Sequence, residues 1–166
     1  MTDDHTLFSE SMQKAAGPAP GTPVFVDVYA KTEGGATKWS HDWRWGENGP
    51  SQGNGTIEIP QRKPDEPGTD MHFYLRDQTD PNCGYQYDKN QGAAMWVKRD
   101  SCPADDKRCD DPQIPADQIV TSPKLLKAFN VNSDMCNLHY RLWFKDKDGK
   151  PDSYDPDITN GGKSSV

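Results

Sequence analysis

The segment 38–45, KWSHDWRW, holds the side chains best suited to binding a ligand. In a β-strand successive side chains point to opposite faces, so every second residue shares a face. One face of this segment would carry a row of rings: Trp39, His41, Trp43 and Trp45. Indole rings about 7 Å apart along a strand suit the stacking of sugar rings, which predicts a glycan-binding surface. The alternative is that the row fills the core of a protein with few aliphatic residues.

An acidic segment near the C-terminus, 145–157, offers oxygen ligands for a metal ion. The candidates for a calcium site are Asp146, Asp148 and Asp152. The spacing does not fit an EF-hand loop, which places glycine sixth, whereas Gly149 is fourth from Asp146. Asp-Gly between two extended segments is typical of a β-hairpin turn. We therefore expect a hairpin and no cofactor, with calcium at the three aspartates as the alternative.

Four cysteines leave the redox state open. Cys102 and Cys109 bracket a loop rich in proline and aspartate, so a disulfide between them would stabilise a loop with little core of its own. Cys83 and Cys136 would then form a second pair, although four cysteines allow three connectivities. Free thiols are the alternative in a reducing compartment. A zinc site is disfavoured because the sequence has no C-x2-C pair.

Motifs for catalysis are scarce, and we predict no catalytic residue. The four histidines lie far apart, and the sequence lacks H-E-x-x-H and G-x-S-x-G motifs. Cys136 and His139 would point to opposite faces of a strand. A hydrolase with a carboxylate or Cys-His site assembled from distant segments stays an alternative, because such sites are defined by geometry rather than by sequence position.

Composition narrows the classes of partner. The 166 residues carry a net charge of −7, which disfavours nucleic acid because phosphate binding needs a basic surface. No apolar stretch is long enough to span a membrane. The first 23 residues do not resemble a secretory signal, so a cytoplasmic protein is expected if Met1 is the native start. Five tryptophans among 10% aromatic residues can build a core despite few aliphatic residues.

Short alternating segments between turn residues predict seven or eight strands. The expected fold is all-β: a single antiparallel β-sandwich, jelly-roll-like, with long polar loops. Residues 1–22 are expected to form a flexible arm, 23–160 the sandwich and 161–166 a flexible tail. The segment 122–133 is ambiguous between a short helix and a strand. The expected strands lie at 22–30, 37–46, 55–60, 71–77, 85–88, 92–100 and 137–145.

The last 25 residues carry an aromatic strand, a short turn, a further aromatic residue and an Asp-Pro-x-Ile segment. The residues concerned are Tyr140, Phe144, Tyr154, Asp155, Pro156 and Ile158. This arrangement resembles the closing motif of bacterial inclusion-body proteins of the AidA/PixA type, although Ser153-Tyr154 replaces the tryptophan that precedes Asp-Pro there. The resemblance implies a lectin-like jelly-roll sandwich that self-assembles or binds a ligand, without catalysis. It implies a role for no particular residue.

The sequence thus predicts a non-catalytic β-sandwich that acts by self-association or by binding another protein. A carbohydrate-binding module that uses the tryptophan row is the first alternative, and a hydrolase is the second.

Overall fold

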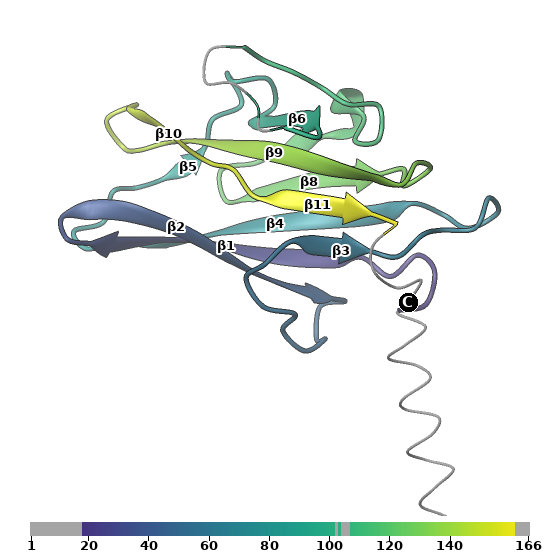
Figure 1. The fold of residues 1–166 in the computed structure, drawn as a ribbon. Helices are drawn as coiled ribbons and strands as arrows, with labels where there is room; N and C mark the ends of the chain where they lie inside the picture. The colour runs from purple at the N-terminus through teal and green to yellow at the C-terminus, as the bar shows by residue number, and fades with distance from the viewer. Residues whose placement is uncertain (1–17, 102, 104–106, 162–166) are drawn as a thin grey trace, which may run out of the picture.

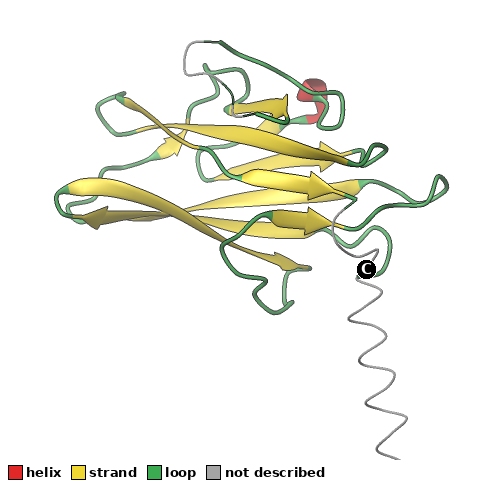
Figure 2. Ribbon diagram, viewed as in Figure 1, coloured by secondary structure: helices red, strands yellow, loops and turns green. Residues whose placement is uncertain are grey.

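The computed structural model describes residues 18–101, 103 and 107–161 and consists of two packed β-sheets (Figures 1 and 2). Sheet A contains, in spatial order, β2 (Ala36–Trp45), β1 (Val24–Glu33), β4 (Thr69–Gln78), β8 (Leu125–Asn130) and β7 (Val120–Thr121). Sheet B contains β10 (Pro151–Tyr154), β9 (Cys136–Lys145), β11 (Asp157–Asn160) and β3 (Ile57–Ile59), with β5 (Gln86–Tyr87) and β6 (Met95–Arg99) also paired to β9. A 3₁₀ turn, η1 (Ala116–Gln118), precedes β7. The prediction of an all-β sandwich is confirmed.

The expectation of purely antiparallel sheets is wrong, because both sheets are mixed. β1 runs parallel to β4, and β11 runs parallel to β3. The physical reason is the path of the chain, which leaves sheet A after β2, forms β3 in sheet B and returns to sheet A at β4. Each crossing between sheets lets the returning strand lie beside an earlier strand in the same direction, which a hairpin cannot do.

The β1–β2 hairpin sets the register of sheet A. Glu33 pairs with Ala36 across a two-residue turn, and the two turn residues, Gly34 and Gly35, have φ of 59° and 79°. Positive φ at both central residues is the requirement of the hairpin turn whose twist matches that of the strands. The ambiguous segment 122–133 is resolved as strand β8, which pairs with β4.

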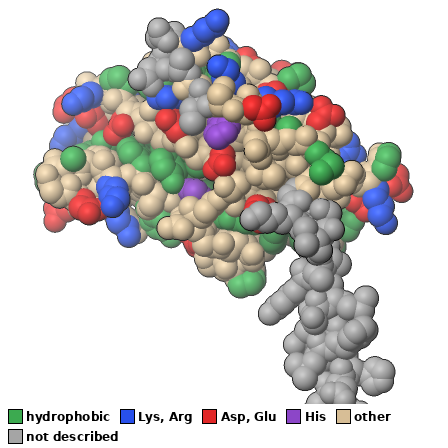
Figure 3. Space-filling model, viewed as in Figure 1, with side chains coloured by type: hydrophobic (Ala, Val, Ile, Leu, Met, Phe, Trp, Pro, Cys, Tyr) green, Lys and Arg blue, Asp and Glu red, His purple; other side chains and the backbone are tan. Residues whose placement is uncertain are grey.

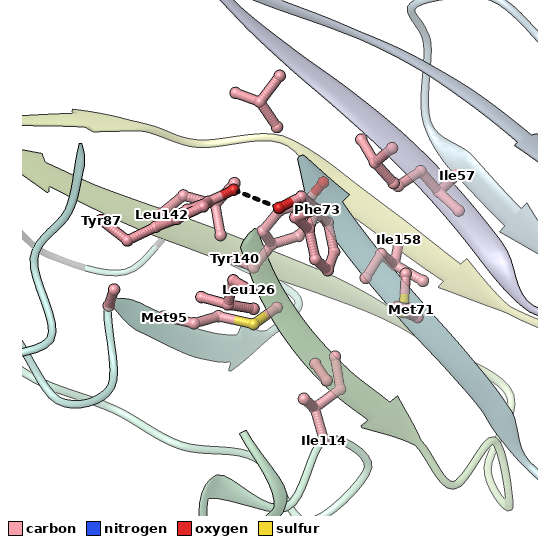
Figure 4. Packing of buried hydrophobic residues seen from close by; sticks show 14 of the residues in the cluster. Ile57, Met71, Phe73, Tyr87, Met95, Ile114, Leu126, Tyr140, Leu142 and Ile158 are labelled. Carbon is pink, nitrogen blue, oxygen red and sulfur yellow. Dashed lines mark hydrogen bonds between the residues drawn. The ribbon is translucent and has the colours of Figure 1, made fainter. Parts of the chain in front are cut away.

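The core lies between the sheets and follows the alternation of the long strands. Sheet A contributes Val26 and Phe73, and sheet B contributes Tyr140 and Leu142, all at most 1% exposed. The rings of Phe73 and Tyr140 meet edge to face at 5.5 Å between centroids (Figure 4). The Tyr87 hydroxyl donates to the Phe73 carbonyl across the core at 3.0 Å, so this buried hydroxyl is satisfied. Aromatic rings therefore provide much of the inter-sheet packing, as the composition predicted.

β9 is the central strand of sheet B, because it pairs with β10, β11, β5 and β6. The β9–β10 hairpin predicted from Asp-Gly is confirmed. Gly149 has a φ of 81°, and Asp146 Oδ1 accepts the backbone N–H groups of Asp148 and Lys150, both at 2.9 Å. An aspartate that caps its own turn in this way stabilises the loop without any ligand.

Two sequence predictions concern the ends of the chain. Most of the arm predicted at 1–22 and most of the tail predicted at 161–166 lie outside the described residues. The strands begin at Val24 and end at Asn160, inside the predicted sandwich boundaries.

Among the described residues, no helix has the length and apolar character that crossing a membrane requires. On the face seen in Figure 3, acidic and basic side chains are interspersed.

Candidate functional site

The tryptophan row lies on one face of β2, as alternation predicted, and that face points into the sandwich. The residues opposite the row on β1 are the core residues Val26, Val28 and Ala30. His41 and Trp43 are buried, each 5% exposed. Trp39 and Trp45 are half-buried and pack against the same core. The row therefore does not form a continuous exposed platform, and glycan binding by it stays a prediction that now rests on the two end rings, Trp39 and Trp45.

Trp39 joins the edge of sheet A to sheet B. Its ring stacks on Phe144 at 4.2 Å between centroids, and its Nε1 donates to Asp152 Oδ2 at 3.0 Å. The same carboxylate oxygen accepts the Tyr85 hydroxyl at 3.4 Å. Asp152, predicted as a calcium ligand, is thus bonded to a residue predicted to bind glycan. The arrangement closes this side of the sandwich with a partly buried hydrogen-bond network.

His41 on β2 makes a second connection between sheet A and sheet B, through Tyr154 on β10. Its Nε2 lies 2.8 Å from the Gly55 carbonyl, which can only accept, so Nε2 carries the proton. Its Nδ1 lies 2.6 Å from the hydroxyl of Tyr154 and accepts from it. Burial, together with the charge of Asp157, raises the pKa of Tyr154 to about 12, so the hydroxyl stays protonated and donates at neutral pH. Both nitrogens of His41 are occupied by structural bonds.

The predicted metal ligands are separated by their roles in the fold. Asp146 caps the turn, Asp148 is exposed at its tip, and Asp152 lies on β10 beside Trp39. Within the described chain, no group of three or more histidine, cysteine, aspartate or glutamate residues could hold a metal ion.

The cysteines give little support to thiol chemistry. Cys83, Cys109 and Cys136 form no disulfide with one another, and Cys102 lies outside the described residues, so the 102–109 disulfide stays a prediction. Burial raises the pKa of Cys109 and of Cys136, which favours the neutral thiol over the nucleophilic thiolate. Cys136 pairs with Asn160 and His139 with Asp157, three positions apart along β9, so their side chains lie on opposite faces.

The opposite, outer face of sheet A carries the other aromatic cluster. We call this surface the A face. It is formed by the side chains of β1, β2, β4, β7 and β8 that point away from sheet B. The Phe25 ring stacks with His72 at 4.8 Å and with Tyr74 at 6.2 Å between centroids, with ring planes 20° and 9° apart. Each strand also contributes an exposed side chain to the A face: Lys31, Lys38, Arg76, Val120 and Lys127.

Charged groups on the A face are arranged around a central carboxylate. Asp27 accepts from Arg44 at 2.7 Å and from Arg76 at 2.9 Å, and the Asp27 side chain is only 13% exposed. Arg44 also lies over the Phe25 ring, at 5.5 Å, and Arg76 lies over the Tyr74 ring, at 5.1 Å. The cations therefore lie over the aromatic rings and are attracted to them. The A face is a mixed aromatic and ionic surface.

His72 makes the stability of the A face sensitive to pH. Burial lowers the pKa of His72 below 6.5, Lys127 lowers it further, and Asp70 opposes the shift only in part. The folded chain consequently binds fewer protons than the unfolded chain just below pH 6.5, so the free energy of unfolding falls as the pH drops through this range. In agreement, His72 Nδ1 is buried with no hydrogen-bond partner among the described residues.

We expect the His72→Phe variant, which keeps the ring stack with Phe25, to lose part of this pH dependence. Urea unfolding of both proteins at pH 7 and at pH 5.5 measures the effect. The wild-type midpoint should fall more between the two pH values than the midpoint of the variant. Equal falls would contradict the assignment to His72.

Sequence reasoning missed several residues of these clusters. Tyr85 lies 67 positions from Asp152, and His41 lies 113 positions from Tyr154, so no local pattern could indicate either contact. The A face could have been found, because Phe25, Asp27 and Tyr29 alternate against the valines of the same strand.

Fold and surfaces together define an all-β sandwich whose best-formed surface is an open sheet face. No protein-family model matches the chain, and no curated protein sequence matches it.

Proposed function

We propose that the protein is a non-catalytic β-sandwich that self-associates, and that two copies pack through their A faces. The observation that carries the proposal is the A face itself, a sheet surface with exposed side chains on all five strands. The buried and hydrogen-bonded state of the residue types that would serve catalysis, such as His41, supports a binding role rather than an enzymatic one.

The area of the A face suits a pair of copies. β1, β2 and β4 each have ten residues, and sheet A has five strands. With a rise of about 3.3 Å per residue and about 4.8 Å between strands, the face measures roughly 600 Å² before side-chain relief is counted. A standard stable interface buries about 800 Å² per partner. A second copy would thus supply a surface of matching size.

The charge of the A face also favours a second copy. Its strands carry five cations, Lys31, Lys38, Arg44, Arg76 and Lys127, and four acids, Asp27, Glu33, Asp42 and Asp70. The A face therefore has a net charge of +1. Because the whole chain has a net charge of −7, the remaining residues have a net charge of −8. Two strongly acidic molecules approach with least repulsion through their nearly neutral faces.

The strand edges are less suited to association, because loops already bond to several of them. Gln52 N donates to the Trp43 carbonyl on the β2 edge at 2.7 Å. Val97 N on β6 donates to the Cys109 carbonyl at 3.0 Å. Covered and short edges are how β-proteins avoid edge-to-edge pairing, so packing of sheet faces is the more favourable mode.

Light scattering on a sizing column, over a hundredfold range of protein concentration in reducing buffer, tests the proposal. The mass should rise with concentration from 18.6 kDa toward twice that value. The Lys31→Glu, Lys127→Glu double variant should stay monomeric, because the two replacements change the charge of the A face from +1 to −3.

A matched control separates this effect from overall charge. Lys98→Glu with Lys150→Glu also changes the chain from −7 to −11, but Lys98 lies on β6 and Lys150 in the β9–β10 turn. The control variant should associate nearly as wild type does. A wild-type protein that stays monomeric throughout, or two variants that behave alike, would disprove association through the A face.

The C-terminal resemblance to AidA/PixA-type proteins, with the jelly-roll architecture that it implies, is consistent with self-assembly and stays a prediction. The carbohydrate-binding alternative now depends on the partly exposed ends of the tryptophan row, Trp39 and Trp45.

A further inference from the structure

A hollow of about 260 Å³ lies at one end of the sandwich, where β2 and β3 end and β4 begins. Trp45 and Ile59 form part of its wall, and prolines of two loops border it. Much of the remaining wall consists of residues with polar side chains: Gln61, Arg62, Lys63, Glu66, Thr69 and Asn132. The hollow is separate from the A face, because Trp45 points toward the interior side of sheet A.

Arg62 is the notable group in this wall. Its Nε donates to the Val131 carbonyl at 2.8 Å, and its Nη1 donates to the Glu66 carbonyl. Both acceptors are neutral, and Arg62 has no carboxylate partner among the described residues. A guanidinium has five N–H donors, so three remain for another acceptor. A half-buried cation held by two backbone carbonyls is a fixed donor group for an anion.

The combination of groups selects the chemical class of the ligand. Arg62 and Lys63 against Glu66 give the hollow a charge of +1 within an acidic chain, which favours a single carboxylate. Trp45 and Ile59 offer apolar side chains, while the surrounding amide and hydroxyl groups suit a ring that carries hydroxyls. The volume is below the range of about 300–1,000 Å³ that is typical of drug-sized ligands, so the hollow fits one sugar unit.

We infer that the Trp45–Arg62 hollow binds an acidic monosaccharide unit, with its carboxylate on Arg62 and its ring against Trp45. This site is independent of association through the A face, and either one can exist without the other.

Titration of the wild-type protein with glucuronate, followed through its indole N–H resonances by NMR, tests the inference. The Trp45→Phe variant identifies the Trp45 resonance, which should shift on titration. Glucose has a similar ring without the carboxylate and should bind about tenfold more weakly or worse, because it lacks the charge-assisted hydrogen bond. Benzoate, which has the carboxylate without hydroxyls, should also bind more weakly than glucuronate.

Two variants that lose the same charge sharpen the test. Arg62→Gln should weaken glucuronate binding about tenfold or more, whereas Lys63→Gln, at an exposed neighbour, should have a smaller effect. If Arg62→Gln does not fold, the wild-type comparison of the three ligands decides. The inference is overturned if glucuronate leaves the Trp45 resonance unmoved, if glucose binds equally well, or if folded Arg62→Gln binds glucuronate as wild type does. Tighter binding of benzoate than of glucuronate would overturn the assignment to a sugar.

Discussion

Replacing Trp43 by alanine is expected to lower the free energy of unfolding by about 3–5 kcal/mol, the range for removing a large aromatic side chain from a core. Trp43 is 5% exposed, lies opposite Val26 on β1 and contacts Trp45 edge to face at 5.8 Å between centroids. Urea unfolding followed by circular dichroism measures the loss. For a domain at the low end of ordinary stability, about 5 kcal/mol, a loss of this size leaves a measurable fraction of the chain unfolded.

The matched control is Trp43→Phe. The Trp43 Nε1 is buried without a hydrogen-bond partner among the described residues, and an unsatisfied buried donor costs about 1–3 kcal/mol. Phenylalanine removes that donor while retaining most of the ring, so the Trp43→Phe variant should lose much less stability than Trp43→Ala. A folded, stable Trp43→Ala protein would show that the ring does not belong to the core and would revive the exposed-platform interpretation.

Replacing Asn130 by leucine is expected to cost about 3 kcal/mol, because it breaks a buried amide pair that joins the two sheets. Asn130 on β8 and Asn160 on β11 are 0% and 2% exposed and bond to each other through both amides, at 2.7 and 3.0 Å. Asn130 Oδ1 also accepts the backbone N–H of Asn132. Leucine removes the partner of Asn160 Oδ1 and of the Asn132 N–H, whereas Asn160 Nδ2 keeps its bond to Gln113 Oε1 at 3.3 Å. Each buried group left unsatisfied costs about 1–3 kcal/mol.

A double-mutant cycle isolates the pair. The Asn130→Leu, Asn160→Leu protein should lose less stability than the sum of the two single variants, because removing the second amide also removes an unsatisfied group. Asn137→Ala, at an exposed position of β9, should change stability by only about 0.5 kcal/mol or less. Additive losses for Asn130 and Asn160 would contradict a coupled pair.

The alternation of residues along single strands correctly predicted which side chains share one face of a strand. It did not predict which face points inward or how the strands pair. The valines of β1 and the rings of β2 were each placed on one face, and both assignments agree with the structure. Alternation could not say which face of β2 points inward, because its neighbour β1 also carries aromatic residues, Phe25 and Tyr29, on the opposite face. The parallel pairing of β1 with β4 depends on two crossings between sheets, and no turn residue encodes a crossing.

The candidate binding residues were likewise predicted only where they lie close together in the sequence. Trp45 was predicted as a ligand-binding residue, but Arg62 was not, because the two meet only when the ends of several strands come together. The acidic segment was correctly predicted as a hairpin, since Asp146 and Gly149 act within one turn. Contacts within a turn are encoded locally, whereas sites at the end of a sandwich are encoded by the whole topology.

The parallel pairing of β3 with β11 constrains how the protein is synthesised. Ile57 pairs with Ile158, so β11, the strand that β3 pairs with among the described residues, is made only about a hundred residues later. At roughly 5–20 residues per second, this interval lasts on the order of 5–20 s. During it, Ile57 and Ile59, both buried in the finished protein, are open to wrong partners. Folding is therefore completed after translation of the sandwich, and chaperones that shield nascent apolar segments should raise its yield.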